Sequence, residues 1–190
     1  IPAVDIAKIF SEIDKEEIPI VFRILPKALA ADTFVELDSE LQQFLIDKLS
    51  DKELKAVMDE LFVDDTVDII EEMPANVVKR MLAQSDNEMR AGINEILKYD
   101  KDSAGSIMTT EYVDLKKHMT VAQSFERIRR IGPDKETIYT CYVTDENRKL
   151  IGLISVKELL LADSSQMIEE IMETNITYVS TVDDQEDVAH

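Results

Sequence analysis

Carboxylates are the side chains in this sequence whose spacing most directly suggests chemistry. Asp64 and Asp68 stand four positions apart, so in a helix both would leave the same face about one turn apart, where like charges repel each other. No Lys or Arg lies between Lys55 and Lys79. The acids in that stretch are Asp59, Glu60, Asp64, Asp65, Asp68, Glu71 and Glu72. The stretch is therefore either a solvated acidic helix face or part of a cation site.

A second acidic stretch lies at the other end of the chain, because no Lys or Arg follows Lys157. The acids there are Glu158, Asp163, Glu169, Glu170, Glu173, Asp183, Asp184, Glu186 and Asp187. Over the whole sequence, 40 acids against 21 bases give a net charge of −19 at pH 7. This charge argues against binding to nucleic acid or to anionic lipid, and it makes a cation the natural partner.

The available ligands favour a hard cation. Mg²⁺ takes oxygen ligands and gives up its water reluctantly, so one or two carboxylates are enough for a weak site. His118, His190 and Cys141 show no spacing typical of a transition-metal site, and a single cysteine excludes an internal disulfide. The sequence has no glycine-rich phosphate loop and no Ser or Cys that pairs suggestively with a His, so we do not expect an enzyme.

The composition is that of a globular chain. Of the 190 residues, 45% are apolar and 32% are charged, which is enough for one large or two small packed domains. No apolar run approaches the roughly 20 residues that span a bilayer, and the N-terminus lacks the pattern of a signal peptide. These features predict a soluble fragment in the cytoplasm.

The elements that must position the first acidic stretch recur with a period of twelve residues. Each repeat pairs the end of one helix with a turn or cap: Leu25 and Pro26, Leu37 and Asp38, Leu49 and Ser50, Leu61 and Phe62, Met73 and Pro74, Ser85 and Asp86. Pro26 and Pro74 suit a first helical position, whereas Asp38, Ser50 and Asp86 suit an N-cap. The pattern predicts helices of about ten residues joined by one or two residues.

Residues 1–98 are therefore expected to form a stack of short helices. Such helices must fold back on one another, and helix pairs that repeat about every 24 residues are typical of an α-solenoid. We expect an acidic superhelical domain over this range. Taken alone, the array favours an interaction scaffold over a more specific function.

The pattern changes after this domain. Residues 99–108 contain Asp100, Asp102, Ser103 and Gly105, which favours a loop, and we interpret them as a domain junction. The next elements are expected to be a strand at 112–115, a helix at 121–130, strands at 137–143 and 150–155, and a helix at 156–161. The chain is thus predicted to combine an α domain with an α/β domain.

A partial copy of the second domain follows. Met108 and the capping Thr120 recur 64 residues later as Met172 and Asp184. We therefore assign residues 109–163 to a first motif and residues 164–190 to the start of a second, incomplete motif.

The order strand-helix-strand-strand-helix resembles a cystathionine-β-synthase (CBS) motif. The segments that carry this resemblance are YVTD at 142–145, LIGLIS at 150–155 and ELL at 158–160. Two further segments, DSAGSIMTTEYV at 102–113 and PDKETIY at 133–139, together resemble a narrower group, the cytosolic region of the MgtE family of magnesium channels or transporters. The resemblance implies a helical N-terminal domain and a CBS pair, here truncated, which dimerises and is followed by a membrane pore on whose cytoplasmic side it lies.

The resemblance also implies a mechanism and a set of ligands. In that family, Mg²⁺ bridges the helical and CBS domains and favours the closed pore. The corresponding ligands would be Asp32, Asp64 and Asp68 in the helical domain and Asp184 and Glu186 in the second CBS motif. Two acidic surfaces repel each other when bare, and divalent ions between them replace that repulsion by bridging.

A different class of ligand remains open, because CBS pairs often hold the adenosine part of a nucleotide such as ATP. Ser155 and Glu158 stand where CBS motifs commonly place a hydroxyl near the phosphate and an Asp on the ribose. Glu158 is one methylene longer than that Asp, and Thr140 replaces a nearby aromatic residue that stacks on the base. The alternatives to Mg²⁺ sensing are therefore nucleotide sensing and an acidic scaffold.

Overall fold

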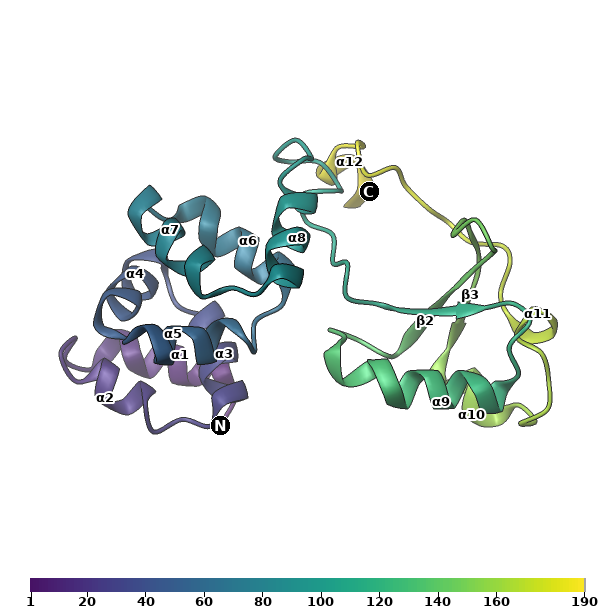
Figure 1. Cartoon of the computed structure of the whole chain (residues 1–190), viewed down its shortest axis with the longest axis horizontal. Helices are drawn as coiled ribbons and strands as arrows, with labels where there is room; N and C mark the ends of the chain where they lie inside the picture. Colours follow the sequence, from purple (N-terminus) through teal and green to yellow (C-terminus); the bar gives the residue numbers. More distant parts are fainter. Residues whose placement is uncertain (190) are drawn as a thin grey trace. The chain divides into compact units, whose positions relative to one another are not determined.

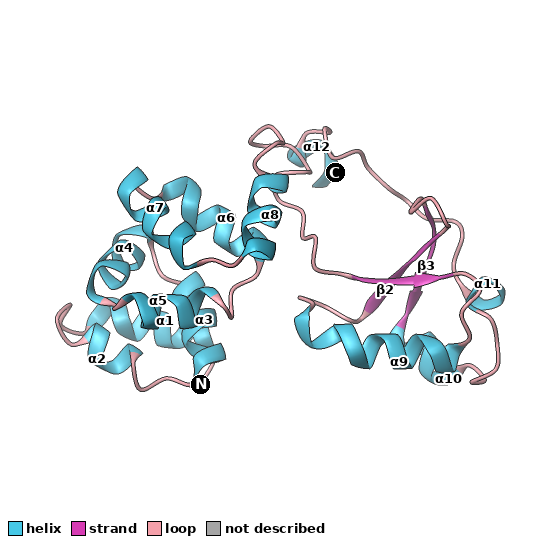
Figure 2. Cartoon of the chain, in the orientation of Figure 1, coloured by secondary structure: helices cyan, strands magenta, loops and turns pink. Residues whose placement is uncertain are grey.

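The computed structural model describes residues 1–189, and the chain divides into two compact units. The first, called the helical unit, comprises Ile1–Lys101 together with Gly105–Met108. The second, called the sheet unit, comprises Asp102–Ala104 and the chain from Thr109 onward. The strands all belong to the sheet unit, whereas the first unit is built from helices (Figure 2). Residues 102–104 thus belong to the sheet unit although Gly105–Met108 after them do not.

The helical unit is a stack of short helices joined by tight turns (Figure 1). The helices are α1 (Ala3–Glu12), α2 (Ile18–Phe22), α3 (Lys27–Val35), α4 (Ser39–Lys48), α5 (Asp51–Met58), α6 (Val63–Glu72), α7 (Ala75–Gln84) and α8 (Asn87–Ile96). The helix α1 packs on α3, α3 on α5 and α5 on α7, while α2 packs on α4 and α6 on α8. Contact between alternate helices is the arrangement of a short superhelix, so the predicted architecture is confirmed.

The twelve-residue spacing of helix starts is confirmed. Asp38, Ser50 and Asp86 each accept a hydrogen bond from the backbone N–H three residues further on, at the starts of α4, α5 and α8. Pro26 and Pro74 were expected at the first helical position but lie at the N-caps of α3 and α7, so each of these helices begins one residue later than expected. A side chain or a proline therefore marks most of these turns.

The core of the helical unit is apolar, and its buried polar groups are hydrogen-bonded. Phe34, Leu45 and Ile46 are among the side chains that are fully buried. The buried amide of Gln42 donates through Nε2 to the carbonyl of Phe34 at 3.0 Å, and the hydroxyl of Thr66 donates to the carbonyl of Phe62 at 2.9 Å. These bonds remove the cost of burying polar groups between the helices.

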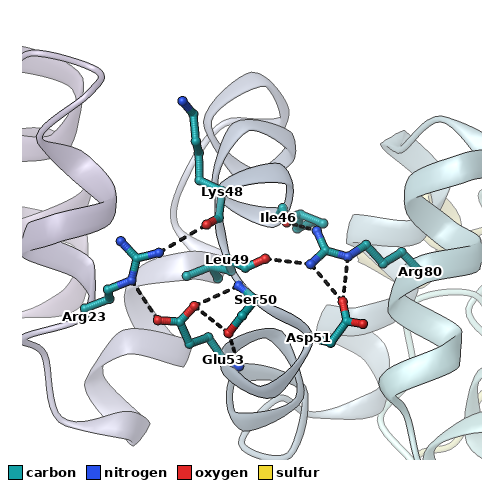
Figure 3. Close-up of polar contacts among 8 residues, drawn as sticks. All are labelled: Arg23, Ile46, Lys48, Leu49, Ser50, Asp51, Glu53 and Arg80. Carbon is teal, nitrogen blue, oxygen red and sulfur yellow. Dashed lines mark hydrogen bonds and ion pairs between the residues drawn. The ribbon is translucent and has the colours of Figure 1, made fainter.

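Arg80 on α7 holds the turn between α4 and α5 from one side (Figure 3). Its guanidinium donates to the carbonyl of Ile46 and, at 2.6 Å, to the carbonyl of Leu49, both of which lie at the C-terminal end of α4. It also pairs with the carboxylate of Asp51 in the first turn of α5 at 2.9 Å. One side chain thus satisfies two free carbonyls and connects three helices.

Arg23 holds the same turn from the other side (Figure 3). It donates to the carbonyl of Lys48 at 3.1 Å and to Glu53 at 2.7 Å. Glu53 also accepts from the backbone and hydroxyl of Ser50, which completes a capping box. The hydrogen bond from Arg23, followed by those from Ser50, lowers the pKa of Glu53 from 4.5 to about 2. Its contribution to stability is therefore present above pH 4.5 and is lost as the pH falls toward 2.

The sheet unit has the predicted strand and helix order. A three-stranded sheet in the order β1 (Val113–Lys116), β2 (Thr140–Thr144) and β3 (Leu150–Ser155) pairs β1 parallel to β2 and β2 antiparallel to β3. The helices α9 (Val121–Ile131) and α10 (Val156–Leu161) lie on the same side of the strands (Figure 1). The CBS-type order is confirmed, although β1 starts one residue and β2 three residues later than expected, and both end one residue later.

The edge strand β3 is partly covered by the segment after α11 (Ile168–Ile171). Leu153 and Glu173 exchange backbone hydrogen bonds at 3.0 and 2.8 Å across this edge. Gly152 permits this close approach, because a Cβ there would lie 2.8 Å from the carbonyl oxygen of Glu173. The last helix, α12 (Gln185–Ala189), follows at the C-terminal end.

We expect Arg80→Met to destabilise the helical unit by about 1–3 kcal/mol, because the substitution leaves two carbonyls at the end of α4 without this donor. Urea unfolding followed by circular dichroism at 222 nm measures this loss. The matched control is Lys55→Met, which removes only an exposed pair with Asp59 and should change stability by less than about 0.5 kcal/mol. Equal effects of the two substitutions would contradict a special role for Arg80.

Candidate functional site

The acidic residues predicted on α6 do share this helix, but their surroundings differ. Asp64 is half-buried and its Oδ1 atom is enclosed, whereas Asp68 is exposed. Asp64 and its neighbour Asp65 lie in the first turn of α6, where the positive end of the helix dipole stabilises a negative charge. Asp68 lies beyond that turn, and no basic residue balances the acids in the last turn. The helix dipole therefore explains a negative charge at Asp64 but not one at Asp68.

Asp68 lines a hollow of about 380 Å³ between α6 and the turn from α3 to α4. The residues around it are Val35, Leu37, Asp38, Ser39, Gln42, Asp65, Asp68, Ile69 and Glu72. The hollow thus carries four carboxylates and no basic side chain. Of the residues predicted as metal ligands, only Asp68 is among those lining it.

Three of these carboxylates were not predicted as site residues. Asp65 and Glu72 lie three positions before and four positions after Asp68, and this spacing places all three side chains along one stripe of the helix. That signal was present in the sequence. Asp38 comes from the N-cap of α4 instead, so its approach depends on the packing of α4 near α6 and left no local signal.

The surroundings of Asp68 disfavour its negative charge. Partial desolvation is the largest cause that raises the pKa of its carboxyl above 3.8, and the carboxylates of Glu71 and Glu72 raise it further. The positive charge of Lys101, which pairs with Glu71 at 3.6 Å, acts in the opposite direction. A cation near Asp68 would relieve this repulsion.

The other predicted ligand of the helical unit, Asp32, lies exposed on α3 and does not line the hollow. Among residues 1–189, no group of three or more His, Cys, Asp or Glu side chains is close enough to enclose a metal ion. Asp32, Asp64 and Asp68 therefore do not form a closed site within this unit. An ion held here would keep much of its water, as Mg²⁺ commonly does.

The predicted ligands Asp184 and Glu186 lie in the sheet unit, at the start of α12. Both are exposed. The carboxylate of Asp184 accepts a hydrogen bond from the backbone N–H of Glu186 at 2.8 Å, and that of Asp183 accepts one from Ser180 at 2.8 Å. Local hydrogen bonds thus orient these carboxylates in a segment that has no basic neighbour.

Ser155 and Glu158, the predicted nucleotide-binding pair, form the capping box of α10. The hydroxyl of Ser155 accepts from the N–H of Glu158 at 3.1 Å, and the carboxylate of Glu158 accepts from the N–H of Ser155 at 2.8 Å. The backbone bond from Ser155, followed by that from its hydroxyl, lowers the pKa of Glu158. Both residues therefore have a structural role, and their role toward a nucleotide stays a prediction.

Among the helices of residues 1–189, none combines the length and the apolar character that are needed to cross a bilayer. Cys141 is buried in β2, where desolvation raises the pKa of its thiol to about 11. It is therefore a core residue.

Family models match both parts of the chain. The MgtE intracellular N domain matches residues 1–102, and the CBS domain matches residues 104–165. The magnesium transporter MgtE of Thermus thermophilus is 36% identical over 189 residues, which cover 97% of this chain and 42% of the relative. The magnesium transporter MgtE of Bacillus subtilis is 26% identical over 185 residues, which cover 97% of this chain and 41% of the relative. The chain thus spans less than half the length of these transporters.

Solved structures agree with this assignment over nearly the whole chain. The crystal structure of the cytosolic domain of the Mg²⁺ channel MgtE in complex with ATP superposes with a TM-score of 0.92 at 35% identity, covering 100% of this chain and 77% of that one. The soluble part of a magnesium transporter superposes with a TM-score of 0.87 at 26% identity, covering 96% of this chain and 72% of that one. This chain, an intracellular N domain followed by a CBS domain, belongs to the MgtE family.

Proposed function

We propose that this chain is the Mg²⁺-sensing regulatory region of a magnesium channel or transporter. The observation that carries the proposal is the acidic hollow along α6, whose lining residues include four carboxylates and no basic side chain, and where the pKa of Asp68 is raised. Acids placed at the cost of helix stability are more readily explained by a cation than by folding. The relatives that match the chain are named magnesium transporters rather than enzymes, which supports the choice of ion.

In the proposed mechanism, Mg²⁺ bridges the acidic surfaces of the two units and thereby favours the closed pore. Asp32, Asp64 and Asp68 would supply oxygen ligands from the helical unit, and Asp184 and Glu186 from the sheet unit. Each surface contributes few carboxylates, so the ions keep several waters and bind weakly. An ion shifts the equilibrium only by the difference in its affinity for the bridged and separated arrangements, so the bridging sites must be the tighter ones.

The remaining parts of the proposal concern the longer protein. Its relatives are more than twice the length of this chain, which leaves room for a membrane pore. The region described would lie on the cytoplasmic side of the membrane and would dimerise through its CBS domains. No nucleic acid is expected as a partner, because the net charge is −19.

Mg²⁺ should compact the protein. We expect the radius of gyration, measured by small-angle scattering on a chain extended through the second CBS motif, to fall as MgCl₂ is raised through the millimolar range. NaCl at equal ionic strength should not reproduce this change, because screening alone provides no bridge. Asp64→Asn and Asp68→Asn should each raise the Mg²⁺ concentration at the midpoint several-fold.

The matched control for this titration is Glu60→Gln, which removes one exposed negative charge from the same acidic stretch but outside the hollow. It should leave the midpoint nearly unchanged. An unchanged radius of gyration in MgCl₂, or the same compaction in NaCl, would refute the bridging mechanism and leave an acidic scaffold.

Asp68→Asn should also stabilise the metal-free protein at pH 7. The pKa of folded Asp68 is raised, so its ionised form destabilises the fold, and stability falls as the pH rises through that pKa. Removing the charge should gain about 0.2–0.5 kcal/mol, or about 1–3 °C in the midpoint of thermal unfolding. Differential scanning calorimetry in EDTA measures the gain, and a gain that persists undiminished in saturating MgCl₂ would argue against a cation at Asp68.

ATP is the second candidate ligand, because the solved cytosolic domain that superposes with a TM-score of 0.92 is a complex with ATP. We expect isothermal titration calorimetry to detect ATP binding that Ser155→Ala weakens several-fold. The helical unit offers a matched control, since Ser50 forms the same capping box with Glu53 as Ser155 forms with Glu158. If Ser50→Ala weakens ATP binding equally, Ser155 acts only as a helix cap.

A further inference from the structure

The junction between the two units is hydrogen-bonded to the acidic segment that precedes α12. The backbone N–H of Ala104 donates to the carbonyl of Asp183 at 2.8 Å, and the N–H of Gln185 donates to the carbonyl of Asp102 at 2.8 Å. Ser103 and Asp184 face each other as an isolated antiparallel bridge. The side-chain amide of Gln185 adds a bond to the carboxylate of Asp102 at 3.3 Å. We call this pairing of residues 102–104 with 183–185 the clip.

The clip begins at the residue where the chain passes from the helical unit to the sheet unit. Lys101 belongs to the helical unit, and Asp102 is the next residue of the chain. A change in the orientation of the helical unit would therefore displace the residues of the clip before the rest of the sheet unit. The second segment of the clip, residues 183–185, contains Asp184, and Glu186 follows Gln185. The part of the chain that carries both predicted ligands is therefore hydrogen-bonded to the junction at residues 99–108, which we call the linker.

The clip is only weakly held. Ser103 is its one buried residue, whereas Asp102, Asp183 and Asp184 are exposed, so it belongs to the parts of a protein that open locally at low cost. Asp102 has a backbone φ of 72°, a left-handed conformation that Asp and Asn tolerate better than most residues. Closing the clip also gathers like charges, since three of its six residues are Asp.

We propose that the clip is a conformational switch that couples the linker to the acidic segment before α12, and that divalent cations favour its closed form. Like charges oppose closure, so cations that gather at the acidic segment lower the cost of closing. The dependence on cations rests on the Mg²⁺ sensing proposed above, whereas the coupling of the linker does not. The two parts are therefore tested separately.

Amide hydrogen exchange in the 190-residue chain tests the cation dependence. The amides of Ala104 and Gln185 should exchange several-fold more slowly in MgCl₂ than in NaCl of equal ionic strength. Asp102→Asn keeps an acceptor and a residue that tolerates the left-handed conformation but removes one charge, so it should slow both amides without Mg²⁺. The matched control Asp100→Asn removes an exposed charge two residues upstream and should change neither.

The outcomes of this exchange experiment are distinct. Exchange of both amides at the rate of an unstructured chain in every buffer would overturn the clip itself. Protection that is equal in MgCl₂ and NaCl would overturn its cation dependence. If scattering shows compaction by Mg²⁺ in that case, Mg²⁺ sensing stands and only the clip is excluded as its element.

An engineered disulfide tests the coupling without any cation. Ser103→Cys combined with Asp184→Cys places two thiols at directly facing positions of an antiparallel bridge, which suits a disulfide. With diamide as oxidant this pair should cross-link several-fold faster than the off-register pair Ser106→Cys and Asp184→Cys. Cys141 is buried and does not compete.

Proteolysis of the cross-linked protein then measures whether the closed clip restrains the linker. Trypsin should cleave after the exposed Lys101 several-fold more slowly in the oxidised than in the reduced protein, in MgCl₂ and NaCl alike. Gln185→Ala, which removes one bond of the clip and no predicted ligand, should instead speed this cleavage. Equal cross-linking of the two cysteine pairs, or a cleavage rate that the disulfide does not change, would overturn the coupling.

Discussion

The free backbone groups at helix ends are the constraint on which the helical unit depends. Helices of about ten residues leave a large fraction of their amides and carbonyls without an intrahelical partner. The sequence meets this demand with Asp or Ser at three N-caps and with proline, which has no amide to satisfy, at two others. The carbonyls at the end of α4 receive Arg23 and Arg80 instead. The superhelix therefore rests on polar groups at its turns as much as on its apolar core.

This constraint explains which features could be predicted from the sequence. Caps such as Ser50 and Asp86 act within three residues, so their spacing predicted where the helices begin. The bonds of Arg80 span about thirty residues and depend on how α7 packs near α4, so no local pattern indicated them. The same distinction holds in the candidate site, where a helical stripe in the sequence contains Asp65 and Glu72 but not Asp38.

The acidic residues of α6 differ in how their charges affect the stability of the helix. Asp64 and Asp65 lie at the N-terminal end of α6 and gain from its dipole, so folding alone accounts for them. Asp68 and Glu72 lie further along, where the dipole gives no such gain, and partial desolvation followed by neighbouring carboxylates raises the pKa of Asp68. Counting acids in a sequence does not separate these two groups. Their position relative to the helix ends does, and it makes Asp68 the strongest candidate for a residue kept for function.

The same reasoning limits what a motif can say about nucleotide binding. Ser155 and Glu158 fit the CBS pattern, yet Ser50 and Glu53 form an identical capping box in a helical domain of another fold. A Ser followed three residues later by Glu is therefore fully explained by the start of a helix. The hydroxyl of Ser155 already donates to the carboxylate of Glu158 and accepts from its N–H, so a nucleotide phosphate would have to compete with Glu158 for this donor. Nucleotide binding in this family member would thus be coupled to the stability of the start of α10. The length of the Glu158 side chain would determine whether its carboxylate can cap the helix and also contact a ribose.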